Sequence, residues 1–556
     1  MTTRLRARTA ARTAKAPRTV EAPRTVEAPR TVEADVCIVG AGISSAMVAE
    51  RLAETTGARI VVVEAGNRIF NLEDRFALRR RNLDYGENPW PDDHVRGLTG
   101  RGIQSRSMAV GGLALHWGAT TPRFTPEDFA VRSLYGVGDD WPIGWDDIEP
   151  WYQEAEERIG VAGEPGPQEL DPRSAPYPMP PLPLSWNLGR LREWGERSGI
   201  PFWPNPVGKN SRPWRGRNVC VRCDTCTICP TGAKYSPDFT FEELLNAGRI
   251  ELLARTLVRR LVLEPGSDRI GHAIAVDRDR PDEEVRLVAR TFVVAAGYAW
   301  SSHLLLLSAQ DRFPTGLANR HDLVGRYLCG HRGINAFVEL PFRLYPGIYG
   351  MDSLLSKRFQ RPGPLDRYVR HDLRIWESAY GREPRLSRDD GELLLGDAAL
   401  ADWRERAQHG AARMRAYWDT LPAASSRLTL DGSRRTASGD PTLRIDLADH
   451  EDTVRLRAHT EERIRTTFER IVDAGGGRLL GVFPGELQDH PGGGCRMGAT
   501  PETGVTDPWG RTWDHENLWV IGAPNLVTAG CNNGTLTFAA LALRSASRIA
   551  QELPAA

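Results

Sequence analysis

Four cysteines at regular spacing are the first residues in this sequence that could do chemistry. Cys220, Cys223, Cys226 and Cys229 each lie three positions apart in CVRCDTCTICPTGAKYSP, and Pro230 follows the last of them. A Cys-x2-Cys-x2-Cys run can wrap an iron–sulfur cluster, although the bacterial ferredoxin run has three residues before its final Cys-Pro. Structural zinc more often uses two separated Cys-x2-Cys pairs. The run therefore predicts a 3Fe-4S or 4Fe-4S cluster, with zinc and metal-free thiols as alternatives.

A glycine turn near the start of the chain predicts a dinucleotide site. In ADVCIVGAGISSAMVAERLAETTGARIVVVEAG, an apolar strand leads into Gly40 and Gly42, and a helix follows. The two glycines let the backbone approach a pyrophosphate at the helix N-terminus, and Ser45 at the third position is small enough for close helix–strand packing. Glu64 ends the next strand, where a carboxylate accepts a ribose hydroxyl. The motif alone fits FAD or NAD, and the long insertion that follows it favours FAD.

The elements that position these residues belong to a large protein without net charge. The chain has 556 residues with 72 basic and 72 acidic side chains, so no net field favours nucleic acid or an anionic membrane. No apolar run approaches about 18 residues, so no membrane span is expected. Residues 1–33 contain three APRTVE repeats, which predict a disordered tail because they offer little apolar surface to bury. The tail lacks a secretory apolar segment, which predicts a cytoplasmic protein, although a targeting role stays open.

Three stretches resemble the glucose-methanol-choline (GMC) oxidoreductases. AVGGLALHWGATTPRF at 109–124 resembles the family's flavin-contacting loop, and WPIGWDDIEPWYQEAEERIGV at 141–161 resembles its next segment. The stretch from DHPGGGCRMG to ALRSASRI at 489–549 is similar to the family's C-terminal signature. The His-Trp pair in the first stretch resembles the sugar-oxidising branch, which includes pyranose oxidases and sugar and aminoglycoside dehydrogenases. The resemblance is weak between 331 and 425.

The resemblance implies an active site with FAD as the cofactor. It makes His490 the catalytic base and Asn533 its partner, since the family has His–His or His–Asn here. A neutral imidazole suits this role, because it can take the hydroxyl proton near neutral pH while the hydride leaves the same carbon. Asn533 would hydrogen-bond the same oxygen, and a helix is expected just after it. The resemblance also places Gly111, Gly112, His116, Trp117, Gly522 and Asn525 against the cofactor.

Two features of the cofactor site stay open in the sequence. His116 either lines the isoalloxazine ring, which the LALHW context favours, or carries a covalent bond to the flavin, as in pyranose oxidases. Some GMC sugar dehydrogenases hold a three-iron cluster in a cysteine loop, which favours a cluster here. A cluster would pass the electrons on singly to an external acceptor. Without it, oxygen becomes the expected acceptor.

The fold class expected is a mixed α/β protein, with a Rossmann-like FAD-binding domain and a discontinuous substrate domain built on an antiparallel sheet. We expect the FAD-binding domain to comprise 34–125, 211–332 and 484–556, and the substrate domain 126–210 and 333–483. The alternating stretches SRLTLDG and PTLRIDLAD predict strands of the antiparallel sheet. The stretch from His450 to the glycines at 475–477 predicts a long helix.

The substrate expected is a carbohydrate alcohol, oxidised to an aldehyde or ketone. Residues 387–405 contain six acidic residues in the expected substrate domain. They would attract a polycation, so an aminoglycoside or its precursor is the first specific hypothesis, and a solvated helical face is the alternative. A simple pyranose or C-glycoside, oxidised with oxygen, is the competing substrate class. A non-catalytic flavin and iron–sulfur electron carrier is the alternative from another class.

Overall fold

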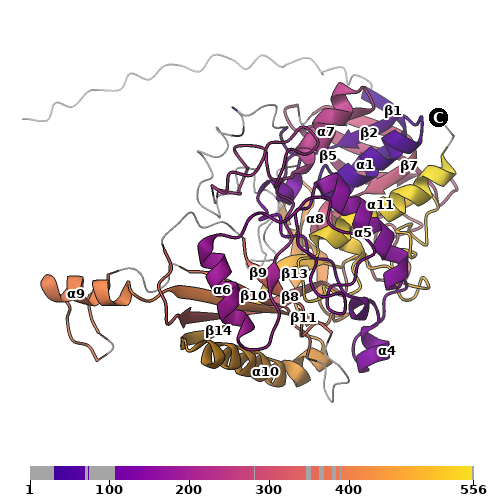
Figure 1. The fold of residues 1–556 in the computed structure, drawn as a ribbon. Helices are drawn as coiled ribbons and strands as arrows, with labels where there is room; N and C mark the ends of the chain where they lie inside the picture. The colour runs from indigo at the N-terminus through magenta and orange to yellow at the C-terminus, as the bar shows by residue number, and fades with distance from the viewer. Residues whose placement is uncertain are drawn as a thin grey trace, which may run out of the picture.

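Two sheets organise the part of the chain that the structure describes. The computed structural model describes residues 30–68, 73, 75, 107–223, 225–280, 282–345, 352–361, 369–378, 384–388, 390–436 and 438–553. One sheet lies in the upper part of Figure 1 and the other in the lower part, and helices cover both.

The first sheet has seven strands and contains the expected dinucleotide motif. Its strands are β1 (Arg30–Val39), β2 (Ile60–Val63), β4 (Ile250–Leu253), β5 (Thr256–Leu263), β6 (Ile270–Asp277), β7 (Glu284–Val294) and β15 (Leu518–Val520). β4, β2, β1, β7 and β15 pair in parallel, and β5, β6 and β7 pair antiparallel. Val36 and Ile38 of β1 enter one core, whereas Cys37 and Val39 enter another, so both faces are covered. The expected Rossmann-like part is confirmed.

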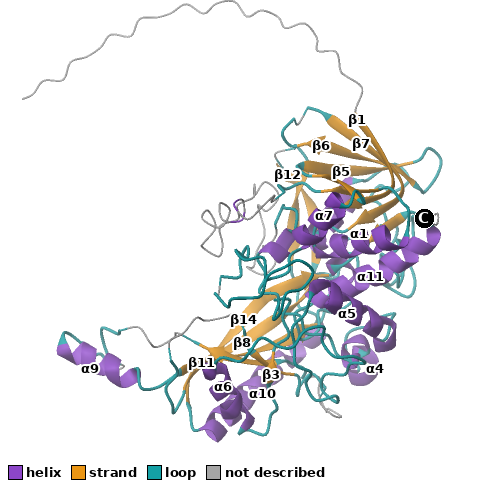
Figure 2. Ribbon diagram, turned by 45° about the horizontal axis from the view of Figure 1, so that its top comes forward, coloured by secondary structure: helices purple, strands orange, loops and turns teal. Residues whose placement is uncertain are grey.

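Helices from distant parts of the sequence cover this sheet. On one face lie α1 (Ile43–Thr55), α5 (Trp145–Ile159) and α11 (Thr535–Glu552), which stack beside one another in Figure 2. On the other face lies α8 (Gly297–Leu307), whose leucines pack with β1 and β2. α11 begins two residues after Asn533, as the sequence predicts.

The first strand begins earlier than expected. Arg30 pairs with Val285 of β7, so four residues of the expected disordered tail, 30–33, belong to the sheet. The reason is their composition, because the RTVE of the third repeat continues into the β-branched strand that follows. The rest of the tail, residues 1–29, lies outside the described residues.

The second sheet has six antiparallel strands in the order β14-β8-β11-β10-β9-β3. The strands are β3 (Trp203–Pro204), β8 (Cys329–Glu339), β9 (Leu354–Ser356), β10 (Leu373–Glu377), β11 (Ala411–Thr420) and β14 (Arg478–Gly492). α6 (Trp186–Glu196) and α10 (Glu451–Gly475) cover one face. Along β11, Ala412, Met414 and Ala416 enter this core, so the residues between them point to the opposite face. The expected antiparallel sheet is confirmed.

The expected domain boundaries fall inside strands. β8 runs across the boundary expected at 332/333, and β14 runs across the one expected at 483/484. These two strands are hydrogen-bonded neighbours. The division into domains stays a prediction, and the described chain continues through both joints within a strand, although the register of β14 shifts after Pro484.

One expectation about the second sheet is wrong. The stretches SRLTLDG and PTLRIDLAD do form strands, β12 (Arg427–Arg435) and β13 (Pro441–Asp446), but these make a separate two-stranded sheet. Leu428 and Leu443 pack against Tyr298 and Ala299 of α8, so the apolar side of the hairpin is buried on the Rossmann-like part. The predicted long helix is α10, which ends at Gly476 in a left-handed conformation.

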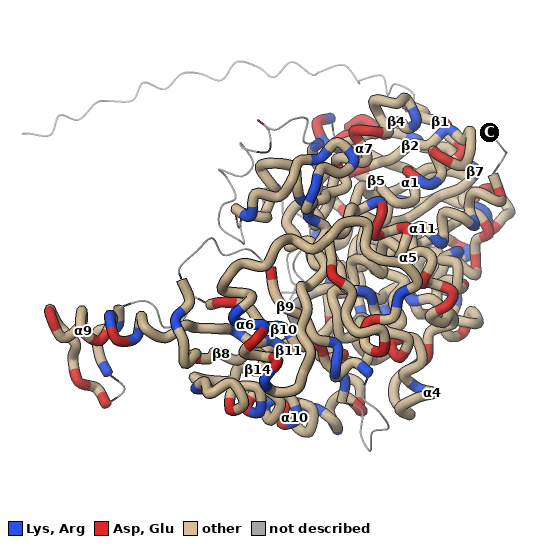
Figure 3. Tube along the Cα trace, in the orientation of Figure 1, with Lys and Arg blue, Asp and Glu red and all other residues tan. Residues whose placement is uncertain are grey.

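The remaining elements are short, and one of them projects from the body. They are η1 (Gly112–Leu115), η2 (Pro126–Phe129), α4 (Val131–Tyr135), α7 (Pro237–Asn246), α9 (Asp397–Arg406) and η3 (Ala523–Asn525). α9 extends away from both sheets in Figures 1 and 2, and Figure 3 shows both acidic and basic residues on it. Among the described residues, no helix combines the length and apolar character needed to cross a bilayer.

Candidate active site

A cavity of about 800 Å³ connects the glycine turn of the first sheet to the open face of the second. Gly40 and Gly42 line one end, and Arg374, Arg415 and Tyr417 line the other. His490 and Asn533 lie along the wall between them. The cavity therefore has room for an extended cofactor at one end and for a substrate at the other.

The glycine turn forms a cradle that side chains would obstruct. Gly40 has a φ of +100°, and a Cβ there would lie 2.8 Å from the Ala295 carbonyl oxygen. Gly42 is the N-cap of α1, and no atom lies within 4 Å of where its Cβ would stand. Glu64 accepts hydrogen bonds from the Ala41 and Gly66 amides at 2.9 and 2.8 Å, and its burial raises its pKa to about 7. Open backbone at a helix N-terminus fits a pyrophosphate, so the residues present fit FAD.

Four of the predicted cofactor residues lie behind the cavity wall rather than on it. Ser45 packs against β7, where its Oγ reaches the Ala295 carbonyl at 3.4 Å, so it holds the helix close to the sheet. Ser44 lines the cavity in its place. Gly111, Gly522 and Asn525 are also absent from the lining. Asn525 Oδ1 accepts a hydrogen bond from the Gly522 amide at 3.1 Å, which stabilises the turn η3.

The turn with the His-Trp pair is held from behind by a buried lysine. Lys234 Nζ donates to the carbonyls of Ala114, Leu115 and Trp117 at 3.1, 2.9 and 3.0 Å. His116 and Trp117 line the cavity, together with Gly112. Burial lowers the pKa of His116 to about 4, and the nearby Lys234 adds to the effect. His116 therefore faces the cavity as a neutral imidazole.

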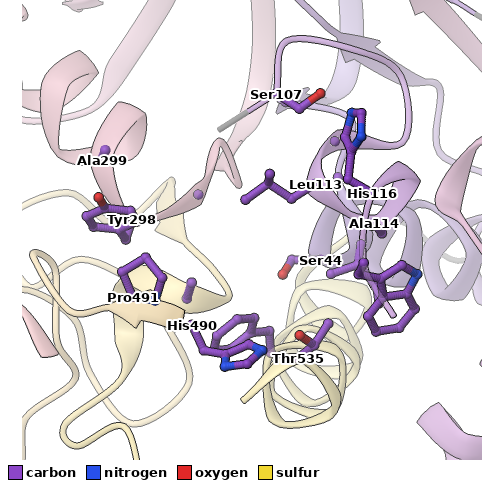
Figure 4. A pocket seen from close by; sticks show the side chains of 18 of the residues that line it. Ser44, Ser107, Leu113, Ala114, His116, Tyr298, Ala299, His490, Pro491 and Thr535 are labelled. Carbon is purple, nitrogen blue, oxygen red and sulfur yellow. The ribbon is translucent and has the colours of Figure 1, made fainter. Parts of the chain in front are cut away.

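His490 lies across the cavity from this turn. Figure 4 shows it beside Thr535, at the N-terminal end of α11, whereas His116 comes from the separate loop with Leu113 and Ala114. His490 has a φ of +57°, a left-handed conformation that is uncommon for a side chain of this size. Strain of this kind clusters at functional sites.

A chain of hydrogen bonds fixes the proton positions around His490. Arg374 donates to Asn533 Oδ1, and a guanidinium can only donate. The amide of Asn533 must then turn its NH2 group towards His490, and Nδ2 lies 2.7 Å from His490 Nε2. Nε2 therefore accepts, which leaves the ring proton on Nδ1, where His331 Nε2 lies 2.9 Å away. The lone pair that would take a substrate proton points at the amide.

The sequence alone did not identify several residues of this wall. Asp372 binds Arg374 Nε at 2.7 Å, and its other oxygen accepts the Tyr417 amide at 2.6 Å. The ring of His331 packs against Tyr417 in a tilted arrangement, with centroids 4.5 Å apart. These residues lie on β8, β10 and β11 or, for Asp372, directly before β10, within the stretch where the resemblance is weak. The alternation of arginine with apolar residues in DLRIWE and AARMRAYWDT is the signal that could have found them.

The four cysteines of the predicted cluster lie together but outside the main cavity. All four line a separate cavity of about 20 Å³, with Lys209 and Lys234. Burial raises the pKa of Cys226, and bonds from the backbone and Thr231 lower that of Cys229. Within the described ranges, which omit Asp224, no three His, Cys, Asp or Glu side chains have the arrangement of a metal site. The thiols share a cavity, but their geometry does not fit a cluster.

The loop also touches the His-Trp turn. The Ile228 amide donates to the Leu115 carbonyl at 2.7 Å, and Lys234, which binds the same carbonyl, follows the last cysteine by five residues. The cysteine run is therefore a support for the turn that faces the cavity.

The acidic stretch at 387–405 does not reach the cavity. None of its described residues lines it, and α9 projects away from it. The stretch therefore gives no support for a polycationic substrate, and the alternative of a solvated face fits its described part.

A Rossmann-like cradle that opens onto a His–Asn pair defines a flavin-dependent oxidoreductase, and the chain belongs to the GMC oxidoreductase family. Residues 422–542 match the family model for GMC oxidoreductases, and residues 38–92 match the model for an NAD(P)-binding Rossmann-like domain. The chain is 31% identical to the fructose dehydrogenase large subunit of Gluconobacter japonicus, over 94% of this chain and 98% of that one. It is also 31% identical to the 6'''-hydroxyparomomycin C oxidase of Streptomyces lividus, over 94% and 92%.

Solved structures agree with the fold. Pyridoxine 4-oxidase from Mesorbium loti superposes with a TM-score of 0.61 at 20% identity, covering 94% of this chain and all of that one. A formate oxidase superposes with a TM-score of 0.58 at 15% identity, covering 94% of this chain and 99% of that one. The chain therefore shares the fold of both proteins.

Proposed function

We propose that this protein oxidises an alcohol group of a carbohydrate-type substrate, with His490 as the base. The observation that carries the proposal is the hydrogen-bond chain that leaves His490 Nε2 as an acceptor on the cavity wall. The names of the relatives support the substrate class, since they include a fructose dehydrogenase and an aminoglycoside oxidase.

The residues of the site divide the reaction between them. The alcohol oxygen inserts between His490 Nε2 and Asn533 Nδ2, which lie 2.7 Å apart when nothing separates them. Nε2 takes the hydroxyl proton, and the amide donates to the oxygen and orients the carbon. FAD, when bound, accepts the hydride from that carbon. The positive end of α11, which begins at Thr535, favours the negative charge that this transfer brings to the site.

The side chains behind the base support the proton transfer. His490 donates its Nδ1 proton to His331, so the imidazole cannot rotate away from the substrate. Glu64, Gly40, Gly42 and Gly112 would hold the dinucleotide, and His116 and Trp117 would lie beside its ring. We propose non-covalent FAD, because Lys234 holds the His116 turn without needing a bond to the cofactor.

The test is anaerobic bleaching of the flavin by D-fructose, D-glucitol and D-glucose. We expect at least one of them to bleach the wild-type flavin, and His490→Ala to slow that bleaching by about 10²- to 10⁴-fold with flavin content retained. His409→Ala removes an exposed histidine outside the cavity lining and serves as the matched control. A wild-type flavin that no carbohydrate alcohol reduces would favour the non-catalytic electron carrier instead.

We also propose that the loop at 220–229 binds an iron–sulfur cluster once its thiols are drawn together. The spacing of the four cysteines in the sequence and the cavity that all four line support this proposal. The arrangement of the thiols in the structure, which is not that of a metal site among the described residues, counts against it. No step of the reaction above passes through a cluster. We expect about three or four irons per flavin, with matching sulfide, in anaerobically purified protein, lost in Cys226→Ser. Flavin without iron would remove the cluster and make oxygen the expected acceptor.

The state of the cysteines supports a cytoplasmic location. All eight are free thiols, as expected in a reducing compartment.

An aminoglycoside substrate is supported by the names of two relatives, the 6'''-hydroxyparomomycin C oxidase and the paromamine 6'-oxidase of Streptomyces fradiae. The charges of the cavity favour another class of carbohydrate.

A further inference from the structure

The substrate end of the cavity contains an arginine that the reaction does not use. Arg415 lies on β11 and lines the cavity. Its Nε is buried and has no hydrogen-bond partner among the described residues. Its guanidinium carbon lies 3.9 Å from the centre of the Tyr417 ring, and Tyr417 packs on His331, the partner of the base.

The position of Arg415 is electrostatically unfavourable in the protein alone. Arg415 is the cross-strand partner of Arg374 in the β10–β11 pair. Like charges directly opposite each other destabilise a sheet. Asp372 is the nearest compensating carboxylate, but it forms its hydrogen bonds with Arg374 Nε and the Tyr417 amide. Burial and Arg415 both lower the pKa of Arg374. Among the residues that the structure describes, one positive charge near His490 therefore has no hydrogen-bonded counter-charge.

The other charged groups at this end do not cancel it. Arg413, two residues before Arg415 on the same face of β11, donates to Asn335 Oδ1 at 2.6 Å. Asp352 is paired with Lys209 at 2.9 Å. Glu377 also lines the cavity, and its carboxylate accepts a hydrogen bond from Asn187. The cavity therefore presents arginines where an incoming ligand approaches the base.

The geometry points to a substrate that carries an oxyanion, either a carboxylate or a phosphate, on the carbohydrate chain whose alcohol is oxidised. Arg415 binds the oxyanion through the edge of its guanidinium, because the face of that group is covered by Tyr417. The anion supplies the missing counter-charge for Arg374 and Arg415, and it anchors the chain with a hydroxyl at His490. The inference rests on the proposed alcohol oxidation and narrows its substrate from carbohydrates in general to acidic ones.

The test compares six-carbon polyols that differ only in one end group. The set is D-gluconate, D-glucitol 1-phosphate, neutral D-glucitol and cationic D-glucamine, which differ only at C1, and each is used to bleach the flavin of the holoenzyme without oxygen. We expect one of the two anions to have the highest kcat/KM and D-glucamine the lowest. Which anion is preferred distinguishes a carboxylate site from a phosphate site. If the neutral or cationic polyol bleaches the flavin faster than both anions, the inference is overturned while the proposed oxidation stands.

Replacement of Arg415 tests whether this side chain causes the preference for an anionic polyol. In Arg415→Gln we expect the ratio of kcat/KM for the preferred anion to that for D-glucitol to fall by about 30- to 100-fold, the loss expected for one hydrogen-bonded charge pair. Arg415→Lys should restore part of the ratio. Arg404→Gln removes a positive charge from the exposed surface of α9 and should leave the ratio as it is. An equal loss for anion and D-glucitol would overturn the inference, because Arg415 would then serve the reaction in general.

Binding without turnover gives an independent readout. Acetate and inorganic phosphate are titrated into the holoenzyme, and the shift of the flavin absorbance is followed. We expect one of them to bind to the wild type and to bind at least about tenfold more weakly to Arg415→Gln. If acetate and phosphate bind equally to both proteins, or to neither, Arg415 is not an anion site. This readout separates a failed anion site from a failed proposed function, in which no polyol bleaches the flavin at all.

Discussion

At the scale of single residues, Arg374 determines which way the amide of Asn533 faces. Its bond to Asn533 Oδ1 turns the NH2 group to His490, and the same bond sets the tautomer of the imidazole. Arg374 is buried, and Asp372 is its charge partner. In the proposed reaction it is therefore a positioning residue, which would act on the alcohol through Asn533 and His490.

Replacement of Arg374 should affect the rate more than substrate binding. In Arg374→Gln we expect kcat for bleaching to fall by about 10- to 100-fold, as for other lost positioning contacts, with a smaller change in KM. Asp372 then lacks its partner, so stability also falls by about 3–5 kcal/mol. The double variant Asp372→Asn with Arg374→Gln removes both charges and should recover much of the stability but not kcat. A recovery of kcat in the double variant would show a purely structural role.

At the scale of elements, sequence pattern predicted what was regular and local. The glycine turn, the helix after Asn533 and the helix α10 follow from periodicity and from glycine positions, and the structure has them. The hairpin β12–β13 was predicted as strands but assigned to the wrong sheet, because alternation fixes which side of a strand is apolar but not what covers it. Ser45, Gly111, Gly522 and Asn525 lie within motifs that touch the cavity, although they themselves support it from behind.

The residues that were missed share one property. His331, Asp372, Arg374 and Arg415 are brought together by strand pairing across separations that no local motif spans. Their neighbours in the sequence belong to the core, so each reads as an ordinary strand position until its partner strand is known. Lys234 is a comparable case, since it lies at the end of the cysteine run and holds a turn about 120 residues earlier.

At the scale of the whole molecule, the buried carboxylates make stability depend on pH. Burial raises the pKa of Asp419, at the end of β11, to about 8, and the neighbouring Asp128 adds to the rise. In the unfolded chain this carboxyl titrates near pH 4. Between these values the folded state binds more protons than the unfolded state, so the free energy of unfolding falls as pH rises from about 4 to 8.

Asp419→Asn should remove this part of the pH dependence. An asparagine resembles the protonated carboxyl, so we expect little change in the melting temperature of the holoprotein at pH 5 and a higher melting temperature than wild type at pH 8. Asp431→Asn, at a partly exposed position of β12 where hydrogen bonds from Ser433 lower the pKa of the carboxyl, is the matched control, and its difference from wild type should not grow with pH in this direction. Equal melting temperatures for Asp419→Asn and wild type at pH 8 would contradict the raised pKa.

The hydrogen-bond chain around His490 also limits how such enzymes can be recombined. Asn533 lies just before α11 of the Rossmann-like part, whereas Arg374, Asp372 and His331 come from strands of the other sheet. A chimera that exchanged the second sheet for that of a relative would change the substrate pocket and the protonation of the base together. A donor sheet that is to bring a new substrate specificity must therefore also bring its own matching arginine. Shuffling libraries that keep β8, β10 and β11 as one block should yield more active variants than libraries that divide these strands.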